Sequence, residues 1–112
     1  MTGLARAERA LRSCWSATPN RLEREHDNLR VAFEWCLGVP ERGRLSLEFA
    51  VALSWFWVKR GYFREGQECL ERALSMAADA PPALRASALT SLGSLTFFQG
   101  DFDRTRVLLE RA

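Results

Sequence analysis

The chain has 112 residues, of which 47% are apolar and 27% charged, a composition typical of one ordinary globular domain. Its 16 basic and 14 acidic side chains are interspersed and leave a net charge of +2. A nucleic-acid interface normally needs a basic stripe, so we expect no direct contact with nucleic acid. The most hydrophobic stretch, residues 49–58, spans ten residues, whereas a membrane crossing needs about 20. We therefore expect no membrane span.

The three cysteines, Cys14, Cys36 and Cys69, are far apart, form no CxxC motif and fall within predicted helices. An odd number of helical cysteines is typical of reduced, mostly buried and inert thiols. The N-terminal residues also lack the apolar core of a signal peptide. These features predict a cytoplasmic protein in which no cysteine is catalytic.

The first two predicted helices form a pair. The first covers residues 4–17. Asn20 and Glu23 have the spacing of a capping box, so we expect the second helix to begin there and to continue to about Gly38. Apolar side chains and the single histidine recur along this second helix at three- and four-residue intervals: Leu22, His26, Leu29, Phe33 and Cys36.

The third predicted helix, residues 43–60, is apolar almost all round. A helix without a polar face must be covered on several sides, so we place it at the centre of the fold. Gly61 is expected to end it in the left-handed conformation, and the fourth helix then follows at once, to about Met76. The pair of prolines at 81 and 82 starts the fifth helix, which stops at Gly100, and Asp101 caps the sixth. Such short glycine turns predict antiparallel hairpins.

The segments 61–73 and 100–112 repeat one another at an interval of 39 residues, with six of their thirteen paired positions identical. A fainter third copy lies upstream at Leu22, Leu29 and Ala32. A recurrence of about 40 residues is typical of stacked helical units, each of which buries its apolar face on the next. The sequence therefore predicts an all-α fold.

We expect one domain, residues 1–112, made of three antiparallel helical hairpins at about 3–39, 43–79 and 82–112. The repeated positions resemble those of the tetratricopeptide repeat. In the last unit the matching residues are Leu89, Leu92, Gly93, Gly100, Leu109 and Ala112, and in the middle unit they are Leu53, Trp57, Gly61, Leu70 and Ala73. The resemblance implies that the hairpins stack into a right-handed superhelix.

Several positions depart from the repeat pattern. Thr96 and Thr105 stand where an aromatic residue and an alanine are usual, and the middle unit departs at Ala50, Ser54 and Gly66. The first unit matches only in its second helix, and the connection at residues 76–82 makes the repeat longer than usual. The likeness is therefore to a tetratricopeptide-like domain.

The string LEREHDNLRVAFEW, residues 22–35, is followed by a tryptophan-rich helix and by GYFREGQECLERAL, residues 61–74. Together they resemble the helical-repeat segment that follows the nucleotide-binding module in bacterial STAND-type ATPases and transcriptional regulators. The resemblance covers about residues 20–112. It implies a sensor or scaffold module of a bacterial signalling or transcriptional regulator, and we expect the chain to be a fragment of such a larger protein. No GxxxxGK[ST] phosphate loop is present, so ATPase activity is not implied for this chain.

The candidate chemistry is sparse. Glu23 and His26 form a Glu-x-x-His pair like those of di-iron helical bundles, but His26 is the only histidine and a single pair does not make such a site. We expect His26 to be structural, and the aromatic side chains of Trp55 and Trp57 to fill core space. No serine or cysteine lies beside a predicted base. We therefore predict no enzyme activity, no catalytic residue, no metal and no cofactor.

A docking surface is the main functional expectation. In tetratricopeptide arrays the first helix of each hairpin lines a concave face that holds peptides. By position this face contains Glu48, Val51, Trp55, Val58, Lys59, Ser87, Thr90, Ser94, Phe97 and Phe98. Adjacent helical residues point about 100° apart, so Phe97 and Phe98 cannot enter the same core, and one of them is expected to be an exposed anchor.

Two interaction functions follow from these residues. In the first, the chain docks a protein or peptide segment on its repeat surface. In the second it is a self-assembly module, because Val107, Leu108 and Leu109 lie in a terminal helix with no later helix to cover them. We expect homodimerisation through the last hairpin or the aromatic third helix. Recognition of RNA by helical repeats needs a positive groove, which Glu48 and Val51 disfavour.

Overall fold

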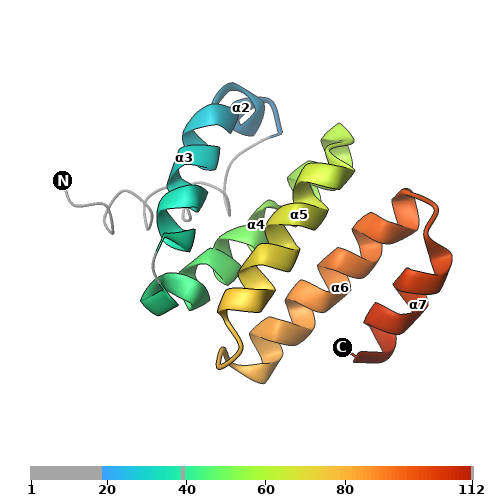
Figure 1. Cartoon of the computed structure of the whole chain (residues 1–112). Helices are drawn as coiled ribbons and strands as arrows, with labels where there is room; N and C mark the ends of the chain where they lie inside the picture. The colour runs from blue at the N-terminus through green and yellow to red at the C-terminus, as the bar shows by residue number, and fades with distance from the viewer. Residues whose placement is uncertain (1–18, 39, 112) are drawn as a thin grey trace.

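The computed structural model describes residues 19–38 and 40–111, and all the regular secondary structure in these residues is helical (Figure 1). The predicted helix at residues 4–17 lies outside the described part of the chain. The described elements are α2 (Pro19–Arg24), α3 (His26–Leu37), a 3-10 turn (Pro40–Arg42), α4 (Gly43–Arg60), α5 (Phe63–Met76), α6 (Pro82–Phe98) and α7 (Phe102–Arg111).

The predicted capping box is wrong, and so is the single second helix. Helix α2 begins at Pro19, so Asn20 lies inside its first turn, and Glu25, at φ −97° and ψ 8°, separates α2 from α3. The two polar side chains of the supposed box bond to the α4–α5 turn instead. Arg60 donates a hydrogen bond to Asn20, and the hydroxyl of Tyr62 donates one to Glu23. These tertiary bonds replace the local cap.

Helix α4 is the central helix, as its sequence predicts. It contacts α2, α3, α5 and α6, and Leu47, Phe49 and Phe56 on it have no solvent exposure. Its first residue is Gly43, where a Cβ atom would lie 2.3 Å from the backbone oxygen of Met76. Only glycine therefore allows α4 to start against the end of α5.

The glycine turns reverse the chain as predicted, so that α4 and α5 lie side by side, as do α6 and α7 (Figure 1). Gly61 and Gly100 adopt left-handed conformations, with φ 78° and 86°. Asp101 then accepts a hydrogen bond from the backbone N–H of Arg104 at 3.2 Å, which confirms its capping role. Helix α6 also packs against both α4 and α5, which joins the two helix pairs.

Three departures from the repeat pattern, at Gly66, Thr96 and Thr105, are explained by the side chains that lie next to them. A Cβ atom at Gly66 would lie 2.8 Å from the Trp57 ring and 2.9 Å from a Leu95 methyl group, so glycine makes room for a large side chain on α4. The hydroxyls of Thr96 and Thr105 hydrogen bond to each other at 2.8 Å in the buried α6–α7 contact. Each threonine therefore satisfies the polar group of the other.

Candidate functional site

A pocket of about 300 Å³ lies between α3 and α5, with α4 as its floor; we call it the α3–α5 pocket. On each helix the lining residues are mostly three or four positions apart, because residues at this spacing lie on one side of a helix. The lining residues are His26, Leu29, Arg30, Phe33 and Glu34 from α3, Leu53, Phe56 and Trp57 from α4, and Glu65, Glu68, Cys69 and Arg72 from α5.

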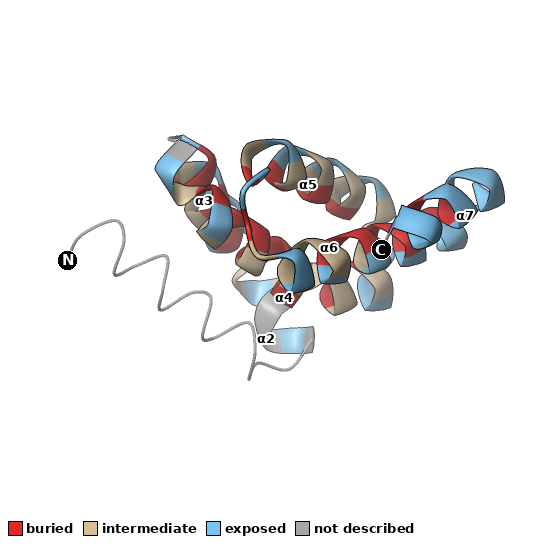
Figure 2. Cartoon of the chain, turned by 90° about the horizontal axis from the view of Figure 1, so that it is seen from below, coloured by how far each residue is buried: buried red, intermediate tan, exposed pale blue. Residues whose placement is uncertain are grey.

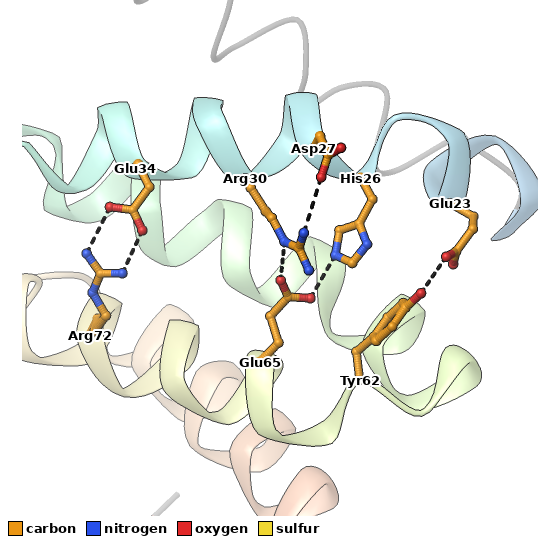
Figure 3. Close-up of polar contacts among 8 residues, drawn as sticks. All are labelled: Glu23, His26, Asp27, Arg30, Glu34, Tyr62, Glu65 and Arg72. Carbon is orange, nitrogen blue, oxygen red and sulfur yellow. Dashed lines mark hydrogen bonds and ion pairs between the residues drawn. The ribbon is translucent and has the colours of Figure 1, made fainter.

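Two polar bridges span this pocket from α3 to α5 (Figure 3). At one end Glu65 receives Arg30 Nε at 2.5 Å on one oxygen and lies 2.7 Å from His26 Nε2 with the other. At the other end Arg72 donates two hydrogen bonds to Glu34, at 2.7 and 3.0 Å. The guanidinium of Arg72 lowers the pKa of Glu34, mainly through these bonds. The two bridges therefore connect α3 and α5, the helices that form the walls of the α3–α5 pocket.

His26 is part of the α3–α5 contact. Besides Glu65, its ring lies 4.8 Å from that of Tyr62 and 5.4 Å from that of Phe56, measured between centroids. Glu23 is directed to Tyr62 instead, and its carboxylate raises the pKa of the Tyr62 hydroxyl by accepting its hydrogen bond. Glu23 and His26 therefore have different partners, and residues 19–38 and 40–111 contain no group of three potential metal ligands.

Two of the three cysteines fall in the described chain, and both are free thiols. Burial is the main cause that raises the pKa of Cys36 to about 11 and that of Cys69 to about 12. A raised pKa favours the protonated thiol, which is a weaker nucleophile than the thiolate. Cys14 lies outside the described residues.

On the opposite side of α4 lies a second depression, which we call the α4–α6 groove. It has a volume of about 320 Å³ and is lined by Ser54, Trp55, Val58, Lys59, Ser91, Ser94 and Phe98. The hydroxyls of Ser54 and Ser94 are bonded to backbone oxygens of their own helices, which leaves the groove mainly apolar. Lys59 makes no ion pair or hydrogen bond with the described residues.

The structure brings five of the predicted docking residues together in this groove: Trp55, Val58, Lys59, Ser94 and Phe98. The others lie apart from it. Glu48 pairs with Arg44 on its own helix at 3.2 Å, and Val51 packs partly buried against the core. Ser87 and Thr90 are exposed on α6, outside the groove. Phe97 lines a different hollow, between α6 and α7.

Three exposed phenylalanine rings and the partly buried ring of Phe63 form a continuous chain at one end of α5, α6 and α7, which we call the phenylalanine row. Phe63 stacks on Phe98 at 5.8 Å, Phe98 meets Phe97 edge-on at 5.7 Å, and Phe97 meets Phe102 at 5.5 Å. We expected one exposed ring of the adjacent pair, but Phe97 and Phe98 are both exposed, by 52% and 55%.

Sequence reasoning missed the exposed ring of Phe102 and the partly buried ring of Phe63 as members of this row. The signal was present, because each follows a turn glycine by two positions in the internal repeat. Both begin a helix after its turn, so their rings lie at the same end of the molecule as the last turn of α6.

Helix α7 presents most of its surface to solvent (Figure 2). Leu108 is buried, whereas Phe102, Val107 and Leu109 expose about half or more of their surface. A shallow hollow of about 530 Å³ beside α7 includes Phe97 and Leu109 and continues the phenylalanine row. The apolar surface therefore extends from the α4–α6 groove to α7.

No helix in the described residues is both long and apolar enough to cross a bilayer. Comparison of the chain with protein-family models, with curated proteins and with solved structures gave no match.

Proposed function

We propose that this chain is a non-enzymatic protein-interaction module that docks a segment of a partner protein in the α4–α6 groove and on the phenylalanine row. The observation that carries the proposal is the run of three exposed rings, Phe98, Phe97 and Phe102, which stacks on the partly buried Phe63 and is continuous with the groove at Phe98. Solvent-exposed aromatic side chains that lie together are typical of interaction surfaces.

The chemistry of this surface defines the segment that would fit it. Trp55, Val58 and Phe98 offer apolar contacts, and Lys59 at the edge offers one positive charge. The matching segment carries large apolar side chains at helical or extended spacing and an acidic residue beside them. The acidic residue supplies specificity and faster association more than affinity.

The fold supports the same proposal. Hairpins α4–α5 and α6–α7 joined through the α4–α6 contact are compatible with tetratricopeptide-like stacking into a superhelix. The left-handed glycines recur at equivalent repeat positions. On this basis we propose that the chain serves as the sensor or scaffold segment of a bacterial signalling or transcriptional regulator of the STAND type, in the cytoplasm.

Peptide selection tests the docking proposal. A random-peptide phage library is selected on the immobilised chain, and the enriched peptide is measured by fluorescence anisotropy. Phe98→Ala should weaken binding at least about tenfold, as expected for a central aromatic anchor, and Lys59→Glu should weaken binding of peptides with an acidic residue. Val31, exposed by 70% on α3, provides the matched control, and Val31→Ala should leave Kd unchanged. Equal binding by all variants would refute this docking site.

Self-assembly is the second candidate, favoured by the exposed Val107 and Leu109 of α7. In that case light scattering finds a dimer, and Leu109→Glu returns it to a monomer while peptide selection yields no enriched sequence. A monomer at tens of micromolar eliminates this alternative.

A further inference from the structure

The docking proposal leaves the α3–α5 pocket without a role. Residues on a helix are rotated by about 100° each, so Leu53, Phe56 and Trp57 occupy one side of α4, and Trp55 and Val58 the opposite side. The pocket and the α4–α6 groove therefore lie on opposite sides of this helix. A ligand in the pocket would not occupy the docking surface.

We propose that the α3–α5 pocket binds a small organic cation with an apolar body, of the arylalkylammonium type. The volume of about 300 Å³ is at the lower end of the range of small-molecule sites, which is about 300–1,000 Å³. Such sites combine an apolar interior with a few polar groups that orient the ligand, and this pocket has both.

The interior is suited to the apolar body. Phe56 and Trp57 are buried side chains of α4 that line the pocket, and Leu53 lies one turn earlier on the same helix. An aromatic face also attracts a cation that approaches within about 6 Å of it. These groups are held in place by close packing, since Trp57 is in contact with Gly66 of α5.

The mouth is suited to a positive head group. Arg30 and Arg72 are each paired with a carboxylate of the same rim, on Glu65 and Glu34, whose oxygens are all engaged. Glu68 remains as the lining carboxylate that makes no ion pair or hydrogen bond with the described residues. The lining residues thus include three carboxylates, on Glu34, Glu65 and Glu68, and two guanidiniums, on Arg30 and Arg72.

Along α5, Glu68 lies between the two bridges. The two bridging residues of α5, Glu65 and Arg72, are seven positions apart, which is roughly 10 Å along a helix axis. Glu68 and Cys69 lie in the turn between them. Burial and then Glu65 raise the pKa of Cys69, Arg72 lowers it, and Glu34 and Glu68 raise it by smaller amounts.

Titration of the full chain followed by NMR tests this inference with three probes of similar shape: 2-phenylethylammonium, neutral 2-phenylethanol and 3-phenylpropionate. The ammonium probe should shift the indole resonance of Trp57 and the resonances of Leu29 and Leu53. The neutral probe should bind about fivefold more weakly, as expected for loss of one exposed ion pair, and the carboxylate probe more weakly still.

Glu68→Gln should weaken binding of the ammonium probe by about the same factor of five and leave the Kd of the neutral probe unchanged. Glu110→Gln, on exposed α7, is the matched control and should change neither. Equal affinity of the three probes, an unchanged Kd in Glu68→Gln, or resonance shifts confined to residues outside the pocket would each overturn the proposal. None of these outcomes bears on peptide docking, whose test uses different residues.

Discussion

The two sides of α4 use their side chains in different ways. On the side of α3 and α5, charged groups bond across the helices, so that Glu34, Glu65 and their arginines satisfy one another above a buried apolar floor. On the side of α6, the serine hydroxyls bond to their own helices, while Phe97 and Phe98 are half-exposed. On the first side the rim residues other than Glu68 are paired with one another, whereas the second side exposes apolar surface that a partner can contact.

The largest expected effect is on the free energy of unfolding, when a buried phenylalanine is replaced rather than an exposed one. Phe56→Ala removes a ring with no exposure and should lower the free energy of unfolding by about 3–5 kcal/mol. Phe97→Ala removes the same group from the surface and should cost about 1 kcal/mol or less, from its edge-on ring contacts. Urea unfolding followed by circular dichroism measures both. Equal losses would mean that Phe97 belongs to the core.

A smaller loss of stability is expected where Gly66 of α5 approaches the Trp57 ring, which lines the α3–α5 pocket. Gly66→Ala gains helix propensity but places a methyl group 2.8 Å from the Trp57 ring, so we expect a net loss of about 1–2 kcal/mol. Ser87→Ala, exposed on α6, gains propensity without a collision and serves as the control. A stabilised Gly66→Ala protein would show that Trp57 has room to move.

The smallest effect concerns the bridge between Glu34 and Arg72. The pKa of Glu34 is lowered in the folded state, so the bridge stabilises the protein above the ordinary carboxyl pKa of 4.5, and this stability is lost as pH falls through the folded-state value. Both side chains are more than half exposed, which limits the contribution to a few tenths of a kcal/mol.

Glu34→Gln should therefore be slightly less stable than the wild type at neutral pH. The difference should shrink at an acidic pH well below 4.5, as the wild-type carboxylate becomes protonated as well. Urea midpoints at the two pH values measure it. A difference independent of pH would mean that the charge of Glu34 does not contribute.

Local features of the fold were predictable from the sequence, because they depend on residues near in the chain. The turns at Gly61 and Gly100 require left-handed backbone, and the all-apolar pattern of residues 43–60 requires a central helix. The break at Glu25 was not predicted, since tertiary bonds from Arg60 and Tyr62 draw the polar groups of α2 away from a local cap.

The candidate sites were predicted less completely. Periodicity indicates which residues of a helix share one side, so Trp55, Val58, Lys59, Ser94 and Phe98 were found. It does not indicate which side chains of distant helices meet. The pair Arg30–Glu65 is separated by 35 residues, and the pocket needs three helices at a fixed spacing. Neither follows from the pattern of one helix.

Hydrogen–deuterium exchange with a selected peptide bound gives the most direct test of the docking surface. We predict slower amide exchange in the last turns of α4 and α6 and in the first turn of α7, with exchange in α3 unchanged. Slower exchange confined to α3 and α5, or no change in α6, would contradict the proposal that the aromatic side of α4 holds the partner.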